Sequence, residues 1–375
     1  MHHLYLHVPF CLRRCSYCDF AVQPTRQPPV EAWLTAMKEE LRLTHAQTEW
    51  PTHIQLRTLY VGGGTPSLLG TGALTRLRAL LEQQGTVEPD VEWSAEANPE
   101  SFTAELARDW LAAGVNRISL GVQSFHAPAL RWMGRLHGAA GAHRAMEAAR
   151  AAGFQNVSVD LIFGLPTPLQ RDWSRDLDLA LQMEPDHVSL YGLTAEPGAA
   201  LGRWVREGRA ELPAEESYAQ EYLHAAEVLS GAGFVHYEVS SFARPGRESQ
   251  HNRAYWSGAA YLGLGPGAHS FRPPERFWNV RDWADYLKRL AAGQLPRADS
   301  EIVGAKEAGL ERVWLGLRTR EGAVLPERTE ALEQTLRRWQ TSGWARVQDA
   351  RVRLTPAGWL LLDRLAVELD GLAPA

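Results

Sequence analysis

Short apolar runs alternate with longer amphipathic stretches through the first half of the chain. Runs rich in β-branched and aromatic residues predict buried strands. The predicted strands are Leu4–Val8, Thr58–Val61, Val91–Ala95, Arg117–Gly121, Ser158–Ile162 and His187–Leu190. The stretches between them have helical spacing and predict helices over Val30–Thr44, Ala73–Gln83, Ala104–Ala113, Gly141–Ala152 and Arg171–Met183.

This repeat of strand, helix and strand predicts parallel pairing with right-handed crossovers. Six such units do not fill the eight of a closed (β/α)8 barrel. We therefore expect an α/β fold built on a partial (β/α)6 barrel that occupies residues 1–235. In such a barrel the site lies at the C-terminal ends of the strands.

The pattern changes after this barrel. Glu215–Ser230 predicts a helix and Phe234–Phe242 a strand, and a glycine-rich stretch follows. We assign residues 236–299 to an α+β extension. Beyond it come two helices, two short strands and a last helix over Pro356–Leu369. That order predicts a C-terminal winged-helix-like domain over residues 300–375.

The composition is that of a globular protein with a large core, since 45% of the 375 residues are hydrophobic and 22% are charged. It excludes a disordered or fibrous chain, and no apolar run approaches the roughly 18 residues of a membrane span. The first residues do not form a secretory signal. The net charge is −5, and residues 301–375 hold eleven basic against eleven acidic residues. We therefore expect no nucleic-acid partner.

Three cysteines, Cys11, Cys15 and Cys18, follow the first predicted strand. An odd, crowded set is a poor disulfide framework and favours a reducing cytoplasm. Three thiolates on one loop can hold one metal centre, and soft sulfur ligands favour iron–sulfur or zinc. A zinc site would need a fourth ligand, for which His7 or His2 could serve. A [4Fe–4S] cluster usually takes four cysteines, so three would leave one iron open to a substrate or cosubstrate.

Glycine and polar residues gather where the next strands end. The segment Gly62–Ser67 follows the second strand, and its glycines let a ligand approach the backbone closely. Glu96 ends the third strand, Gln123 follows the fourth, and Asp160 lies on the fifth. Such a ring at successive strand ends favours a bound ligand, to which Arg135 could add a positive charge. For the glycine segment the alternative is an ordinary tight turn. For the polar residues at the strand ends it is a set of hydrogen-bonded groups at the barrel rim, and for Arg135 a solvated helix face.

The CxxxCxxC spacing, with Tyr17 before the last cysteine, resembles the signature of the radical S-adenosylmethionine (SAM) superfamily. In that superfamily the amino and carboxylate groups of SAM chelate the open iron of a [4Fe–4S] cluster. A reduced cluster then cleaves a carbon–sulfur bond of SAM to give a 5′-deoxyadenosyl radical. The resemblance implies that SAM is contacted by Tyr5, Tyr17, Gly63, Gly64, Thr65, Glu96, Gln123, Arg135 and Asp160.

Almost the whole chain is similar to the oxygen-independent coproporphyrinogen III oxidase group, as YLHVPFC, GGGTPS, GVQSF and VDLIFGLP show. The oxidase has a further cysteine two positions after the last cluster ligand, where this chain has Phe20. The segment His251–Trp256, HNRAYW, resembles the HNxxYW motif of the haem chaperone (HemW) branch. Members of that branch bind haem and pass it to haem-requiring proteins. The resemblance makes His251, Tyr255 and Trp256 the candidate haem-binding residues.

The sequence thus predicts a cytoplasmic haem chaperone with a SAM-ligated [4Fe–4S] cluster, haem as cargo, haem-accepting proteins as partners and an electron donor of the flavodoxin or ferredoxin type. Whether it is also an enzyme stays open, as does a peripheral membrane contact. One alternative is an anaerobic coproporphyrinogen III oxidase, against which Phe20 argues. Another is a zinc-stabilised binding module. For His251 the alternative is a core histidine packed beside two aromatic residues.

Overall fold

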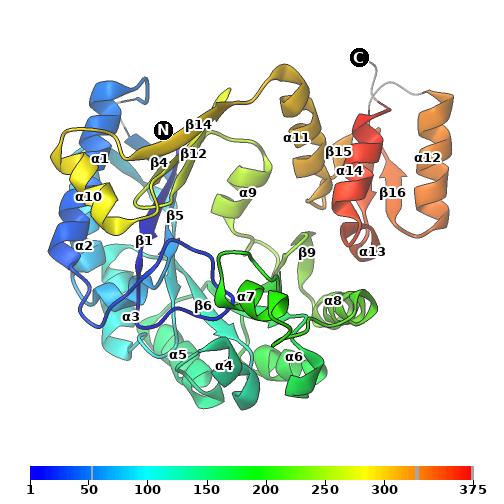
Figure 1. The fold of residues 1–375 in the computed structure, drawn as a ribbon, viewed down its shortest axis with the longest axis horizontal. Coiled ribbons are helices and arrows are strands. Elements are labelled where there is room, and N and C mark those ends of the chain that lie inside the picture. Colours follow the sequence, from blue (N-terminus) through cyan, green and yellow to red (C-terminus); the bar gives the residue numbers. More distant parts are fainter. Residues whose placement is uncertain (52–53, 326–328, 373–375) are drawn as a thin grey trace.

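The structure is a computed structural model that describes residues 1–51, 54–325 and 329–372. Among these residues a nine-stranded sheet forms the centre, in the order β11-β1-β4-β5-β6-β7-β8-β10-β9 (Figure 1). Its strands are β1 (His3–Val8), β4 (Ile54–Gly63), β5 (Gly85–Ala97), β6 (Arg117–Gln123), β7 (Val157–Phe163), β8 (His187–Gly192), β9 (Val235–Glu238), β10 (Ser241–Ala243) and β11 (Leu262–Leu264).

The six predicted strands are β1, β4, β5, β6, β7 and β8, and each pairs in parallel with the next. The connecting helices are α1 (Val30–Gln47), α2 (Ala73–Glu82), α3 (Ala104–Ala113), α4 (Ala127–Met133), α5 (Ala139–Ala152) and α6 (Trp173–Gln182), with short 3₁₀ turns at Pro66–Leu69 and Thr167–Leu169. Figure 1 shows these helices in an arc outside the sheet. The predicted α/β fold with a parallel sheet is confirmed.

The α3 unit shows why the elements form where the sequence predicts them. The Thr103 hydroxyl accepts a hydrogen bond from the Leu106 amide at 3.2 Å and caps the helix. Gly114 ends it in the left-handed conformation, with φ of +106°. Trp110 of α3 and Trp93 of β5 are fully buried. The core between helices and sheet thus fixes the strand ends that carry the site.

Two edges of the sheet differ from the prediction. Phe234–Phe242 is an antiparallel hairpin of β9 and β10, because the chain turns between Glu238 and Ser241. At the other edge β11 adds a parallel strand beside β1 that we did not predict. Leucine alternates with glycine in β11, and a Cβ at Gly263 would lie only 2.2 Å from the His269 carbonyl oxygen. Glycine is required there by close backbone packing.

The remaining elements before the C-terminal part lie around the sheet rather than on one side of it. They are β2 (Phe10–Cys11), β3 (Gln23–Pro24), α7 (Ala200–Arg206), α8 (Glu215–Gly231), α9 (Gln250–Trp256), β12 (His269–Arg272), β13 (Glu275–Asn279), α10 (Trp283–Ala291) and β14 (Arg297–Ile302). The strands β12, β13 and β14 form an antiparallel sheet. The boundaries we expected after residues 235 and 299 fall inside β9 and β14, so the division into domains stays a prediction.

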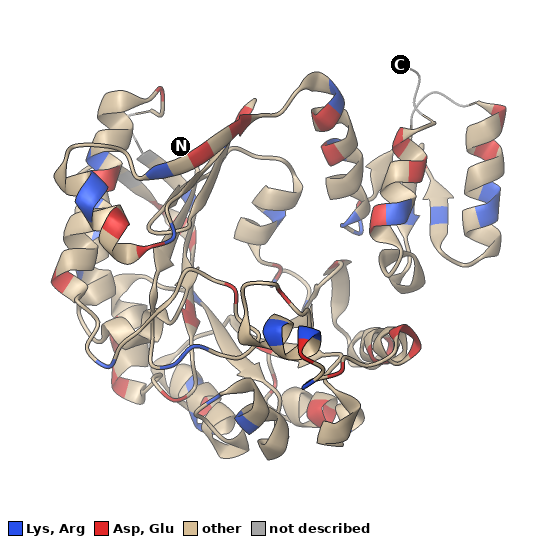
Figure 2. Ribbon diagram, in the orientation of Figure 1, with Lys and Arg blue, Asp and Glu red and all other residues tan. Residues whose placement is uncertain are grey.

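The C-terminal part contains α11 (Ala305–Leu317), β15 (Ala323–Val324), α12 (Glu330–Thr341), β16 (Ala345–Gln348), β17 (Arg351–Leu354), α13 (Pro356–Trp359) and α14 (Leu362–Asp370). The single last helix that we predicted is two helices, because the backbone of Leu361 is not helical. Figure 2 shows basic and acidic residues interspersed along the ribbon of these elements. No helix among the described residues is long and apolar enough to cross a membrane.

Candidate functional site

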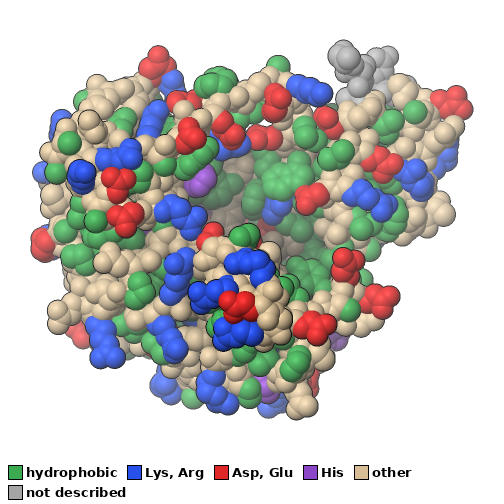
Figure 3. All heavy atoms as spheres, viewed as in Figure 1, with side chains coloured by type: hydrophobic (Ala, Val, Ile, Leu, Met, Phe, Trp, Pro, Cys, Tyr) green, Lys and Arg blue, Asp and Glu red, His purple; other side chains and the backbone are tan. Residues whose placement is uncertain are grey.

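A large cavity opens at the C-terminal ends of the parallel strands, where the fold predicts a site. Its volume is about 1230 Å³. One wall is the segment of residues 11–22, which we call the cysteine loop. The ends of β4 to β8 form the floor, and α9, the β12–β13 hairpin and α11 form the opposite wall. Figure 3 shows this face hollowed, with hydrophobic side chains on the walls of the hollow.

All three cysteines are free thiols that line this cavity. The Thr65 hydroxyl donates to Cys11 Sγ at 3.4 Å, and Arg135 Nη1 lies 3.7 Å from Cys15 Sγ. Burial raises the pKa of the Cys11 thiol to about 12. This sulfur therefore ionises readily only beside a compensating metal charge. The described residues contain no group of three His, Cys, Asp or Glu side chains arranged to hold one metal ion, so both the zinc site and the three-cysteine cluster remain predictions.

The two histidines suggested as fourth ligands are engaged elsewhere. His7 Nε2 lies 2.8 Å from the Ala21 carbonyl oxygen, which can only accept, so Nε2 carries the proton. Burial lowers the pKa of His7 to about 4, which keeps the ring neutral. Its Nδ1 therefore accepts from the Tyr5 hydroxyl at 3.0 Å. His2 contacts the Gln55 carbonyl oxygen and is not among the residues that line the cavity.

The glycine turn after β4 brings its backbone against the cysteine loop. Gly63 has a φ of +106°, and a Cβ there would lie 2.3 Å from the His7 ring. A Cβ at Gly64 would lie 2.7 Å from the Val8 carbonyl oxygen. The amide of Gly63 donates to Glu96 Oε2 at 2.9 Å. Only glycine fits this cradle, which leaves the turn open toward the cavity.

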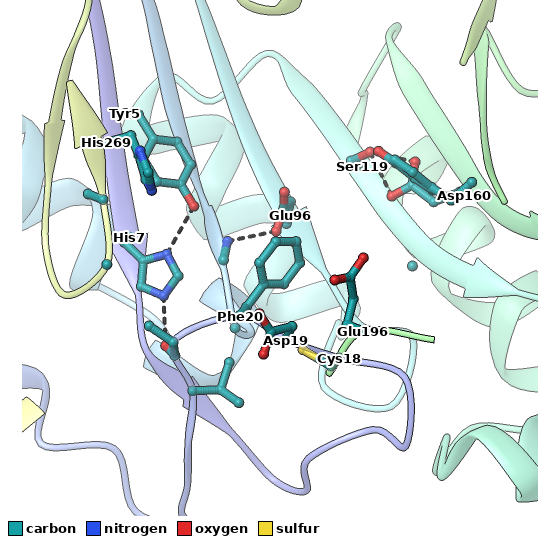
Figure 4. Close-up of a pocket in the computed structure, with 18 of the residues that line it drawn as sticks. Tyr5, His7, Cys18, Asp19, Phe20, Glu96, Ser119, Asp160, Glu196 and His269 are labelled. Carbon is teal, nitrogen blue, oxygen red and sulfur yellow. Dashed lines mark hydrogen bonds between the residues drawn. The ribbon is translucent and has the colours of Figure 1, made fainter. Parts of the chain in front are cut away.

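Two acids, the half-buried Glu96 and the buried Asp160, face the cavity from the strand ends (Figure 4). Tyr60 donates its hydroxyl proton to Glu96 Oε1 at 2.9 Å, and burial raises the pKa of Glu96 to about 7. Ser119 donates to the Asp160 carboxylate at 2.9 Å, and burial raises the pKa of Asp160 as well. Each carboxyl group has acceptor capacity left for a ligand ammonium or hydroxyl group.

Buried polar atoms without partners point to a missing polar ligand. Gln123 is held at a φ of +68°, which is rare for a residue other than glycine and marks local strain. Its Oε1 is buried and makes no hydrogen bond to any described residue, and the same holds for Arg135 Nε. The other end of Arg135 is fixed, since Nη2 donates to Asn98 Oδ1 and to the Gly121 carbonyl oxygen, each at 2.6 Å. Such groups normally find a partner, so this donor and acceptor set fits an amino-acid or nucleoside ligand.

The structure brings together every residue that the sequence suggested for the cluster and for SAM. All of them line the one cavity: Tyr5, Cys11, Cys15, Tyr17, Cys18, Gly63, Gly64, Thr65, Glu96, Gln123, Arg135 and Asp160. Burial of the aromatic pair raises the pKa of both Tyr5 and Tyr17, which keeps their hydroxyl groups protonated. Co-location does not test each role, so the individual assignments remain predictions.

The HNxxYW segment forms α9, whose N-terminus is held by two side chains. The Ser249 hydroxyl accepts a hydrogen bond from the Asn252 amide at 3.3 Å. The Glu92 carboxylate accepts from the Gln250 and His251 amides at 2.9 and 3.0 Å. Because these acceptors satisfy the free amides of the first turn, the short helix is anchored to β5.

Within this motif the histidine is buried, whereas the two aromatic residues reach the cavity. His251 is 1% exposed, with Nδ1 2.7 Å from Thr58 Oγ1 and Nε2 2.8 Å from the Tyr255 hydroxyl. It does not line the cavity, although Tyr255 and Trp256 do. The guanidinium of Arg318 lies 4.3 Å from the centre of the Trp256 ring. In this structure His251 therefore positions Tyr255, and both of its ring nitrogens are engaged.

Sequence reasoning missed several residues of the cavity wall. Asn98 accepts the hydrogen bond that fixes Arg135. Its position directly after β5, where a strand end meets the site, could have identified it from the sequence. His269 and Trp278 also line the cavity, from β12 and β13. They lie opposite each other on paired strands, and this pairing becomes visible only once the strands are known.

Comparisons with known proteins agree with this geometry. The model of the radical SAM superfamily matches residues 5–180. The heme chaperone HemW of Mycobacterium tuberculosis is 40% identical over 98% of this chain and 94% of that protein. The heme chaperone HemW of Bacillus subtilis is 36% identical over 85% of this chain and 83% of that protein. The chain belongs to the HemW family of the radical SAM superfamily.

The fold of this HemW family member is shared with an oxidase of known structure. Coproporphyrinogen III oxidase (HemN) from Escherichia coli superposes with a TM-score of 0.81 over 98% of this chain and 89% of that one, at 21% identity. At this identity the likeness shows the fold alone. The position of interest in the HemW chain is Phe20, which lines the cavity and is 62% exposed. Figure 4 shows its ring among the cavity side chains, beside Glu96 in this view.

Proposed function

We propose that this protein is a cytoplasmic haem chaperone, which takes up haem in its cavity and delivers it to haem-requiring acceptor proteins. Membership of the HemW family supports the proposal. The observation that carries it is Phe20, an exposed apolar ring beside Cys18 at the place where the oxidase pattern requires a further cysteine. A cavity of about 1230 Å³ with aromatic walls is large enough for a flat tetrapyrrole.

We further propose that Cys11, Cys15 and Cys18 hold a [4Fe–4S] cluster, and that SAM lies against the glycine turn. The bound cluster would supply one open iron and a single electron. The Arg135 guanidinium would orient the SAM carboxylate, and Glu96 would accept from the SAM ammonium group. The Asp160 carboxylate is oriented by the hydrogen bond that it accepts from Ser119, and it would also accept one from a ribose hydroxyl group. Phe20 covers part of this space with an apolar side chain.

The proposal implies partners as well. Reduction of the cluster requires an electron donor, for which a flavodoxin or ferredoxin is the expected type. Delivery of haem requires an acceptor protein that docks where the cavity opens. A contact with the membrane surface is an additional proposal. No described element of the chain specifies these partners.

The deciding experiment is anaerobic purification followed by titration of iron, sulfide and haem. We expect four irons and four sulfides per chain with SAM bound at the cluster, retained haem, and no conversion of coproporphyrinogen III under reducing conditions. Robust turnover of coproporphyrinogen III without haem retention would establish the oxidase alternative. Zinc without iron or sulfide would establish the zinc module.

A further inference from the structure

One face of the β12–β13 hairpin presents a distinctive set of side chains to the cavity. In the pairing register His269 lies opposite Trp278, and Phe271 lies opposite Arg276. All four line the cavity, whereas Ser270 between His269 and Phe271 is fully buried. Successive residues of a strand point to opposite faces, so the hairpin places an imidazole, two aromatic rings and a guanidinium on one surface.

Few histidines are available to the cavity. Among the described residues only His7 and His269 line it. Both ring nitrogens of His7 are engaged, by the Tyr5 hydroxyl and the Ala21 carbonyl oxygen. His269 is exposed, and its ring makes no hydrogen bond to any residue that the structure describes. It is therefore the available imidazole of the cavity wall.

The surroundings of His269 suit a metal ligand. The Trp278 ring stacks on the imidazole, with centroids 5.6 Å apart and an interplanar angle of 23°, which fixes the orientation of the ring. Partial desolvation at the cavity wall and the nearby guanidinium groups of Arg276 and Arg281 lower the pKa of His269, which favours the neutral imidazole that binds iron. Tyr261, also in the wall, is a poorer candidate because burial raises its pKa and keeps the phenol protonated.

We propose that His269, held by Trp278, is the axial ligand of the haem iron, and that His251 is not a ligand but positions Tyr255. The proposal rests on the proposed function, because it names the residue that would hold the haem cargo. The tetrapyrrole would then lie along the aromatic wall formed by Trp256, Tyr261 and Phe271, across the cavity from Asp160. Figure 4 shows His269 on the β1 side of the cavity and Asp160 on the opposite side.

The test compares the electron paramagnetic resonance of ferric haem in full-length wild type, His269→Gly and His251→Gln, with the cluster in its oxidised, diamagnetic state. We expect the nitrogen-ligated signature in wild type and in His251→Gln. We expect its loss in His269→Gly and its return when free imidazole is added to fill the vacated space. Trp278→Leu should keep the ligand but broaden the signal, because the ring is then less firmly oriented.

The outcomes separate this proposal from the proposed function. If wild type binds no haem, both fail. If wild type binds haem and His269→Gly gives an unchanged signature, the ligand assignment fails while the chaperone proposal stands. Loss of the signature in a folded His251→Gln protein, with His269→Gly unchanged, would make His251 the ligand. Rescue of His269→Gly by imidazole supports the assignment and also shows that the variant is folded.

Discussion

Arg135 donates a 2.6 Å hydrogen bond to the side-chain oxygen of Asn98, and this contact holds the guanidinium between the end of β5 and the cysteine loop. The same nitrogen donates to the Gly121 carbonyl oxygen, also at 2.6 Å. Nη1 meanwhile lies 3.7 Å from Cys15 Sγ. One side of the guanidinium is thus fixed by protein, and the remaining donor, Nε, is buried without a partner among the described residues.

Replacing Arg135 by Lys should weaken SAM binding by about tenfold or more, because an ammonium group cannot keep three planar contacts at once and a hydrogen bond to a charged group contributes about 1.5–3 kcal/mol. Iron content should not change, since Arg135 supplies no cluster ligand. Equilibrium dialysis of SAM against anaerobically prepared protein measures the effect. Unchanged SAM affinity would remove Arg135 from the site.

Replacing any one of Cys11, Cys15 or Cys18 by Ala should abolish the absorbance near ~400 nm expected of a thiolate-ligated cluster. The protein should stay folded, since the hydrophobic core between sheet and helices does not include the three cysteines. Ser16→Ala is the matched control from the same loop. It should retain the absorbance, because among the described residues the Ser16 hydroxyl donates only to the Trp132 carbonyl oxygen. Unfolding of the cysteine variants, seen by circular dichroism, would instead make the metal structural.

Gly63 and Gly70 form a second matched pair, because both have positive φ but only one is crowded. A Cβ at Gly63 would meet the His7 ring at 2.3 Å, whereas Gly70 has no atom within 4 Å of that position. Gly70→Ala should cost about 1–3 kcal/mol of stability, because a φ of +76° with a ψ of −175° is a conformation that essentially only glycine adopts, and should leave SAM binding unchanged. Gly63→Ala should cost more and weaken SAM binding. Equal effects of the two changes on SAM affinity would contradict the proposal that SAM lies against the glycine turn.

A buried carboxyl group ties α1 to the wall of the cavity. Glu40 is 3% exposed and accepts hydrogen bonds from Asn279 Nδ2 at 2.5 Å, from the Gly265 amide at 2.8 Å and from the Tyr286 hydroxyl. These contacts hold the turn after β11, and with it the start of β12. Burial nonetheless raises the pKa of Glu40 to about 7 in the folded protein.

The folded-state pKa of Glu40 lies above its usual 4.5, so folding favours the protonated carboxyl group. The stability that protonated Glu40 contributes is therefore fully present below about pH 4.5 and is lost as the pH rises through 7. The free energy of unfolding should therefore fall between about pH 5 and pH 8. Glu40→Gln cannot ionise, so its stability should fall less over the same range. Urea denaturation of both proteins at several pH values measures the difference. Identical slopes would show that Glu40 is ionised in the folded protein throughout.

The sequence predicts the parallel sheet well, because each central strand is a continuous apolar run. It misses β11, where glycine replaces every second side chain to admit the His269 carbonyl oxygen. It also misreads the β9–β10 hairpin as one strand, since a tight turn there carries no glycine or proline. These features depend on contacts between distant segments, which no local pattern reports.

For the site, motif spacing was enough to collect the residues around the cysteine loop. It could not show that His251 is buried, because helical spacing places Tyr255 on the same face without saying whether that face meets a cavity or the sheet. Its hydrogen bond to Thr58 comes from a strand almost two hundred residues earlier. His269 was missed for the same reason, since its neighbour Trp278 lies on a different strand.

The cavity is one continuous space from the cysteine loop to the β12–β13 hairpin. Occupants of its two ends would therefore share walls and volume, and filling one end would change the free energy of filling the other. Thermodynamic linkage makes that effect mutual, so SAM would alter haem affinity by the same factor by which haem alters SAM affinity. A shared cavity of this kind would couple haem binding to the concentration of SAM without a conformational change.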